Sequence, residues 1–93
     1  MLRCTAAAAR TIEDRRKALG VSETSGLRVF DVPNPNGQTG IRMTFVDEPI
    51  EGDVVVEAHG ERIFIARGAT AQLDGRELDA APEVAPAGLI LRP

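Results

Sequence analysis

From residue 27 onward, the chain is a series of short strand-like runs separated by turns that contain glycine. The run 41–46 alternates most regularly and places Ile41, Met43 and Phe45 on one face. This alternation predicts a sheet with one buried face and one solvent-exposed face. An antiparallel or mixed sheet is therefore the expected main element. The runs that we expect to be strands are 27–32, 41–46, 54–58 and 61–66, with 88–91 as one further short strand, and a turn at Asp74-Gly75 precedes Glu77-Leu78.

The segment before these runs predicts a single helix over residues 6–19. Thr5 precedes four alanines and is a suitable N-cap, and Gly20 is a suitable C′ residue. Glu13 and Lys17 form an i,i+4 pair in the favourable order. One helix followed by short strands indicates an α+β, mainly β, fold class. Three apolar residues can share the buried face of the helix: Ala8, Ile12 and Leu19.

Turn signals fix several connections between the runs. Asn36-Gly37 is a good turn dipeptide between the first two strands, and His59-Gly60 predicts a hairpin with a two-residue loop. We expect segment 67–73 to contain one helical turn. The segment 80–87 is rich in Ala and Pro and is expected to be a loose connection. No repeat or internal linker is evident, so residues 1–93 are expected to form one domain.

Composition excludes several classes of function. The net charge is −3 and only 3% of the residues are aromatic, with no Trp or Tyr, which argues against nucleic-acid binding. A single cysteine rules out an internal disulfide and suits a reducing cytoplasm. We expect a cytoplasmic protein without a membrane span or signal peptide.

Few side chains are candidates for metal binding or catalysis. Zinc and iron–sulfur sites need converging thiolates or imidazoles, and Cys4 and His59 are the only residues of these types. Cys4 is better explained as a small apolar residue of an N-terminal strand, and His59 as a turn residue that tolerates positive φ. Asp47, Glu48, Glu51 and Asp53 lack the spacing of a Ca²⁺ loop and are expected to be solvated. No catalytic constellation is present, so we expect no enzyme, no metal site and no cofactor.

The polar segment 33–40 (PNPNGQTG) lies between the first two predicted strands and raises a separate question. It contains two prolines and two glycines, and it carries no ionisable side chain. Its prolines stiffen the approach to the turn. The residues of this segment that bear on function are Asn34, Asn36, Gly37, Gln38 and Gly40.

Several stretches together resemble one known family over essentially the whole chain. They are TAAAARTIEDRRKAL, GLRVFDV, IRMTFVDEPIEGDVVVEAHGERIFI, LDGRELD and GLILRP, with Phe45-Val46-Asp47-Glu48-Pro49 the most recognisable piece. The chain resembles the HesB-like, A-type iron–sulfur carrier family (IscA-like). The resemblance implies a folded β-sandwich, or pseudobarrel, of short mixed strands packed with the N-terminal helix. It also implies dimers or higher oligomers and a link to iron–sulfur cluster assembly.

The resemblance further implies three cysteine ligands, and we expect none of them here. One ligand lies in the loop before the Phe-Val-Asp-Glu-Pro phrase, and counting back from Phe45 without gaps places it at Asn36. The other two form a Cys-Gly-Cys tail, and the sequence ends at Pro93 without one. An Asn amide does not replace a thiolate in a cluster.

These observations predict a non-enzymatic, cysteine-depleted HesB-like domain that serves as an interaction or accessory module. Its expected partners are proteins, including iron–sulfur assembly components and further copies of itself. The alternative is an iron or iron–sulfur carrier that uses Cys4 across an oligomer interface, supplemented by His59 or carboxylates.

Overall fold

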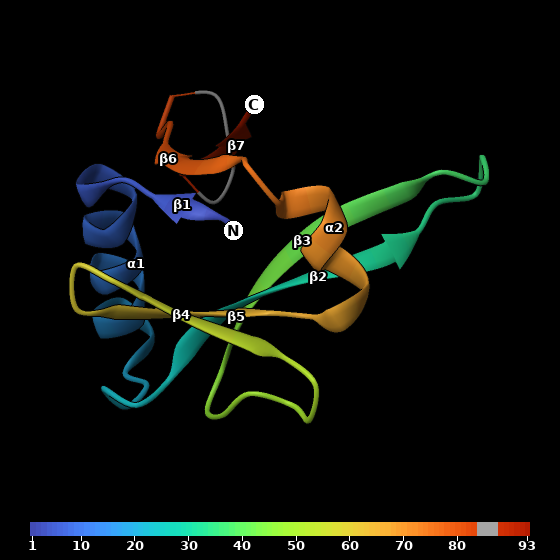
Figure 1. The fold of residues 1–93 in the computed structure, drawn as a ribbon. Helices are drawn as coiled ribbons and strands as arrows, with labels where there is room; N and C mark the ends of the chain where they lie inside the picture. Colours follow the sequence, from blue (N-terminus) through green and yellow to red (C-terminus); the bar gives the residue numbers. More distant parts are fainter. Residues whose placement is uncertain (84–87) are drawn as a thin grey trace.

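The structure, a computed structural model, describes residues 1–83 and 88–93, so residues 84–87 of the Ala/Pro-rich segment lie outside the described residues. The described chain contains two sheets, one long helix and two short consecutive helical segments (Figure 1). The strands are β1 (Arg3–Cys4), β2 (Gly26–Pro33), β3 (Thr39–Val46), β4 (Val54–Ala58), β5 (Glu61–Ile65), β6 (Glu77–Ala80) and β7 (Leu89–Arg92). The helical segments are α1 (Ala6–Leu19), the 3-10 turn η1 (Arg67–Ala69) and α2 (Thr70–Leu73).

Helix α1 begins and ends where its sequence predicts. The Thr5 hydroxyl accepts a hydrogen bond from the Ala8 amide at 3.1 Å, and Gly20 closes the helix with a φ of 70°. Ala8 and Ile12 are buried as expected. Leu19 is not, because it lies in the last turn of the helix, where its side chain is 61% exposed.

The larger sheet has the strand order β3-β2-β5-β4. Strands β2 and β3 form an antiparallel hairpin, as do β4 and β5, whereas β2 and β5 pair in parallel. Because β3 and β4 lie at opposite edges, the connection 47–53 must cross from one edge of the sheet to the other. This crossover is a tertiary feature, and no local pattern in the sequence predicts it.

The smaller sheet, β1-β6-β7, and helix α1 cover one face of the larger sheet (Figure 1). Short strands from both ends of the chain meet there, since β1 pairs in parallel with β6 and β6 pairs antiparallel with β7. This arrangement confirms the predicted α+β, mainly β, fold of short mixed strands with an N-terminal helix. The leucine, isoleucine and valine side chains of the shared core are Leu2, Ile12, Leu27, Val29, Ile63, Ile65, Leu73, Leu78 and Leu89.

The face of the larger sheet that points away from α1 is less exposed to solvent than β3 alone suggests. Arg42 and Thr44 alternate with the half-buried Met43, in agreement with the expected pattern. Phe64 of β5 is nevertheless fully buried on that opposite face, since its register partner Arg28 alternates with the core residues of β2. The predicted exposed face is therefore found along β3, whereas Phe64 of β5 is buried on it, beside Gly26. Among residues 1–83 and 88–93, no helix is long and apolar enough to span a membrane.

Candidate functional site

The segment 33–40 forms the closed end of the β2–β3 hairpin. The Asn34 amide donates to the Gln38 carbonyl at 2.8 Å, and the Gly37 amide donates to the Asn34 carbonyl at 3.0 Å. Gly37 has a φ of 84°, which glycine adopts without steric cost. These bonds define a three-residue loop, Pro35-Asn36-Gly37, of the kind in which a turn is followed by a left-handed residue.

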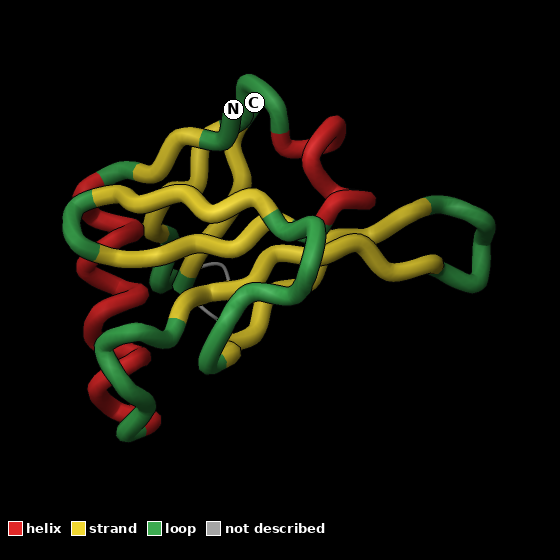
Figure 2. Tube along the Cα trace, turned by 60° about the horizontal axis from the view of Figure 1, so that its bottom comes forward, coloured by secondary structure: helices red, strands yellow, loops and turns green. Residues whose placement is uncertain are grey.

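The side chain of Asn36 takes part in this loop. Its Oδ1 accepts a hydrogen bond from the Gln38 amide at 3.0 Å. Residues 33–39 are all exposed, and Gly40 is half-buried, where a Cβ atom would lie 3.1 Å from the side-chain amide of Asn34. The hairpin carries this loop beyond the rest of the molecule, on the side opposite α1 (Figure 1, Figure 2). The assignment of Asn36 to the family's ligand position stays a prediction.

Cys4 lies in β1, where it is the register partner of Leu78. The Sγ atom is half-buried and donates to the Thr5 carbonyl at 3.5 Å. Burial, and then the negative charge of Asp79, raise the pKa of the Cys4 thiol. A thiol in these surroundings holds its proton, so it is a poor nucleophile and a poor metal ligand.

His59 is at the tip of the β4–β5 hairpin with a φ of 52°, followed by Gly60 with a φ of 83°. Two successive positive φ angles match the two-residue loop that the sequence predicts. The imidazole borders a shallow polar depression beside α1, together with Arg10 and Glu13. His59 is thus explained as a turn residue, and the structure does not place it with the thiol of Cys4 in a metal site.

The candidate residues do not fit an iron–sulfur cluster. Across residues 1–83 and 88–93, no group of three or more His, Cys, Asp or Glu side chains could hold a metal ion. Asn36, Cys4 and His59 lie on separate loops and strands. The side chains of one copy of this chain therefore do not provide the ligands that a cluster requires.

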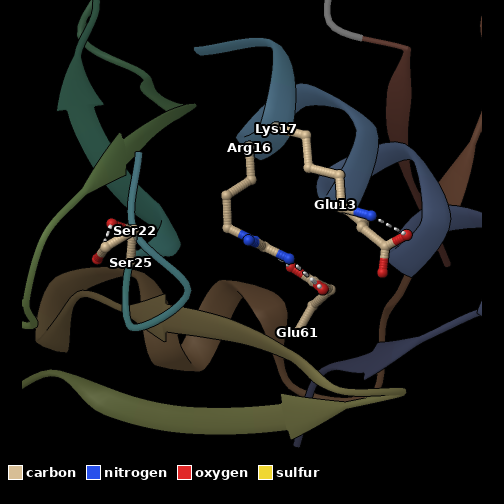
Figure 3. A network of polar contacts seen from close by, with 6 residues as sticks. All are labelled: Glu13, Arg16, Lys17, Ser22, Ser25 and Glu61. Carbon is tan, nitrogen blue, oxygen red and sulfur yellow. Dashed lines mark hydrogen bonds and ion pairs between the residues drawn. The ribbon is translucent and has the colours of Figure 1, made fainter. Parts of the chain in front are cut away.

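Two ion pairs that the sequence analysis did not identify connect distant elements. The first joins α1 to the start of β5, where Arg16 and Glu61 point toward one another (Figure 3). Arg16 Nε lies 3.0 Å from Glu61 Oε1, and Nη2 lies 3.2 Å from Oε2. Both side chains are largely buried. The predicted Glu13–Lys17 pair also forms, at 3.4 Å, on the exposed side of the same helix.

The second ion pair holds the crossover against β2. Arg28 donates to both carboxylate oxygens of Asp53, at 2.9 and 3.0 Å, and also lies 5.5 Å from the centre of the Phe30 ring. The Asp53 side chain is only 2% exposed. The expectation that the whole acidic group is solvated is therefore wrong for Asp53, although Asp47, Glu48 and Glu51 are exposed.

A groove lies between α1 and the edge strand β3, with a volume of about 180 Å³. Arg15 and Thr44 lie at its border. Its apolar lining mixes exposed and buried side chains, and Leu19 is the most exposed of them. The apolar residues that line it are Ile12, Leu19, Leu27, Met43, Phe45 and Leu89.

Three solved structures share this fold over nearly the whole chain. IscA with its [2Fe-2S] cluster matches with a TM-score of 0.75 and 26% identity, over 99% of this chain and 82% of that one. Escherichia coli SufA, involved in biosynthesis of iron–sulfur clusters, matches with a TM-score of 0.74 and 26% identity. This match covers 98% of this chain and 76% of SufA. A protein from Aquifex aeolicus, whose structure was solved in solution, matches with a TM-score of 0.74 and 26% identity. This match covers 99% of this chain and 90% of that protein. No protein-family model and no curated protein matches the chain.

The fold is thus related to the folds of iron–sulfur cluster assembly proteins. Within that class, the three structural neighbours support the HesB-like, IscA-like family as the one that this chain resembles, and the chain has a single cysteine. The predicted resemblance is therefore confirmed.

The comparison contradicts one prediction from the sequence. We expected no cofactor, whereas one of the matched structures is IscA holding a [2Fe-2S] cluster, which points to iron–sulfur binding. The donor set of this chain does not fit a cluster by itself, as described above. Similarity of fold and suitability of the ligands therefore disagree in this protein.

Proposed function

We propose that this chain is an accessory protein of iron–sulfur cluster assembly that acts through contacts with other proteins rather than as an enzyme. The observation that carries the proposal is the agreement of its fold with IscA and SufA over 98–99% of the chain. With one cysteine per chain, a cluster in contact with this protein would take most of its thiolates from a second protein.

The proposal includes the site and the setting predicted from the sequence. Asn36 takes the position of the family's first cysteine, at the end of the projecting hairpin. Residues 1–93 act as one domain, which is supported by a core that α1 and both sheets share. The single cysteine suits a cytoplasmic setting.

We propose that the groove between α1 and β3 is the contact surface, and that it also mediates association with a second copy. Strand β3 is eight residues long, forms one edge of its sheet and pairs with β2 without interruption. An edge of this kind presents unpaired backbone groups to a further strand. The half-buried Met43 and Phe45 and the exposed Leu19 supply adjoining apolar surface.

Leu19→Asp tests this surface, because the Leu19 side chain is exposed and its replacement leaves the core intact. We expect the variant to lose association with itself, measured by light scattering after gel filtration, and to lose binding to purified cluster-assembly proteins. Ile50→Asp is the matched control, since Ile50 is 59% exposed in the crossover turn. Equal behaviour of the two variants would argue against the groove. A wild type that binds no cluster-assembly protein would overturn the accessory function itself.

A second candidate function follows from the cluster in IscA: carriage of iron or an iron–sulfur cluster by Cys4 across an oligomer interface. Anaerobic reconstitution with ferrous iron and sulfide, alongside a Cys4→Ser variant, separates the two. Stoichiometric iron and a charge-transfer absorption band that the variant lacks would establish the carrier. We expect the purified chain alone to give neither, because the thiol is half-buried and holds its proton.

A further inference from the structure

The only two asparagines of the chain lie at the end of the β2–β3 hairpin, and they differ in the residue that follows. Asn34 precedes Pro35, and Asn36 precedes Gly37. We propose that Asn36 is a site of spontaneous deamidation, and that the hydrogen bonds of the folded loop slow this reaction. The proposal concerns the chain itself and does not depend on the proposed function.

The reaction needs only the chain and water. The backbone nitrogen of Gly37 attacks the Cγ atom of Asn36, so a nitrogen–carbon bond forms and a five-membered succinimide results. The Gly37 nitrogen loses its proton, and the side-chain nitrogen leaves as ammonia. Water then adds to either carbonyl of the ring and opens it, giving aspartate or isoaspartate. No electrons are transferred, and no oxidant or reductant is required.

The local structure supplies what this attack needs at Asn36 and withholds it at Asn34. Both residues are exposed, so water reaches each of them. Gly37 has no side chain to shield its nitrogen, and its φ of 84° favours glycine at that position. Pro35 has no backbone N–H to lose, so Asn34 cannot form the ring by the same route. The loop therefore contains a reactive asparagine and an unreactive one two residues apart.

Two hydrogen bonds restrain the reactive residue. The attacking nitrogen of Gly37 donates to the Asn34 carbonyl at 3.0 Å, and the Oδ1 of Asn36 accepts from the Gln38 amide at 3.0 Å. Both bonds must open before the nitrogen can approach Cγ. An exposed hairpin end opens locally far more often than the whole domain unfolds. Deamidation is therefore expected in the folded protein, at a lower rate than in the unfolded chain.

The two products affect the hairpin differently. Aspartate at position 36 keeps an oxygen that accepts from the Gln38 amide, and it adds one negative charge at the projecting loop. Isoaspartate also adds a backbone methylene to a three-residue loop, which displaces the Gly37 amide from the Asn34 carbonyl. The first product changes the charge of the hairpin end, whereas the second also loosens the pairing of Pro33 with Thr39.

Peptide mapping tests the proposal on the intact protein. Samples incubated at mildly alkaline pH are digested with trypsin, and the fragment between Arg28 and Arg42 contains both asparagines. We expect a mass gain of about 1 Da, the replacement of an amide by an acid, located by fragmentation at residue 36 and not at residue 34. A parallel sample in urea should gain this mass faster. Asn36→Gln, which keeps an amide on a longer side chain, should remove the signal.

Each result bears on one part of the proposal. No mass gain at residue 36 in either sample would overturn the modification site, as would an equal gain at residue 34. A folded sample that reacts as fast as the unfolded one would overturn the restraint by the loop. Isoelectric focusing of the aged protein should show a parallel shift by a single negative charge, and its absence would count against the site.

Discussion

Arg28 of β2 and Asp53 of the crossover form a two-point ion pair on the face of the larger sheet that lies away from α1, with nitrogen–oxygen distances of 2.9 and 3.0 Å. Asp53 also accepts a hydrogen bond from the Ile50 amide at 3.0 Å, so one carboxylate holds both the turn and the strand beneath it. The pair thereby fixes the connection that runs between the two edges of the sheet.

Removing the guanidinium should destabilise the fold strongly. Arg28→Met keeps much of the aliphatic stem but leaves the Asp53 carboxylate buried without its partner, and such a loss costs about 3 kcal/mol. Arg62→Met is the matched control, since the Arg62–Glu57 pair is exposed and should contribute less than about 1 kcal/mol. Denaturant unfolding of both variants measures the difference. Equal losses would show that the buried pair does not hold the crossover.

The same pair gives stability a dependence on acid. The hydrogen bond from Arg28 is the main cause that holds the pKa of Asp53 below its ordinary value of 3.8. A group whose pKa is lowered by folding stabilises the protein above its unfolded pKa, and this contribution is lost as pH falls through the folded pKa. Stability should therefore decline below about pH 4, with a shallower decline in Asp53→Asn than in a control such as Glu48→Gln. Urea midpoints measured across this range provide the test, and an unchanged slope in Asp53→Asn would contradict it.

Gly26 is needed because of the Phe64 ring rather than for a special backbone angle. A Cβ at this position would lie 2.6 Å from the ring and 2.9 Å from the Arg62 carbonyl oxygen, and neither can move freely. Gly26→Ala should cost about 1–3 kcal/mol through overpacking. In Gly40→Ala, the added carbon meets only the amide end of Asn34 at 3.1 Å, so the cost should stay near 0.5 kcal/mol. Thermal or denaturant unfolding that ranks the two variants in the opposite order would refute this account.

Cys4 should react slowly with thiol reagents in the folded protein. Burial and the charge of Asp79 raise the pKa of the thiol, so the thiolate fraction at neutral pH is low. The pH profile of the reaction with a disulfide reagent measures this pKa directly. Asp79→Asn should shift the profile to lower pH, because it removes the negative charge that raises the thiol pKa. The shift should recover less than half of the total rise in pKa, since burial is the larger cause. A folded protein that reacts as fast as the unfolded chain would contradict this.

The predictions that succeeded concern features set by neighbouring residues. Thr5 and Gly20 cap α1 because their bonds reach only a few residues along the chain. The Asn36-Gly37 and His59-Gly60 turns form because glycine, with asparagine or histidine beside it, suits the backbone angles of tight loops. These interactions close short segments at low entropic cost, so a local reading of the sequence identifies them.

The predictions that failed depend on where distant segments meet. Leu19 matches the apolar side of α1 by its spacing, yet the end of the helix lies over an open groove. Asp53 belongs to an acidic run, yet its own carboxylate is buried between the crossover and β2, where it pairs with Arg28. In both cases the residue type is compatible with either environment, and the packing of other elements selects one.

The sequence by itself determined the helix, most of the strands and both hairpins, because these rest on backbone preferences and spacings within short stretches. The resemblance to the HesB-like family rests separately on the quoted stretches, such as Phe45-Val46-Asp47-Glu48-Pro49. Only the tertiary structure decided that β2 pairs in parallel with β5, that residues 47–53 cross the sheet, and that Arg16 and Arg28 meet Glu61 and Asp53. Arg16 and Glu61 are 45 positions apart in the sequence, and Arg28 and Asp53 are 25 positions apart. Their formation depends on burial and loop closure across the whole chain, which no local pattern encodes.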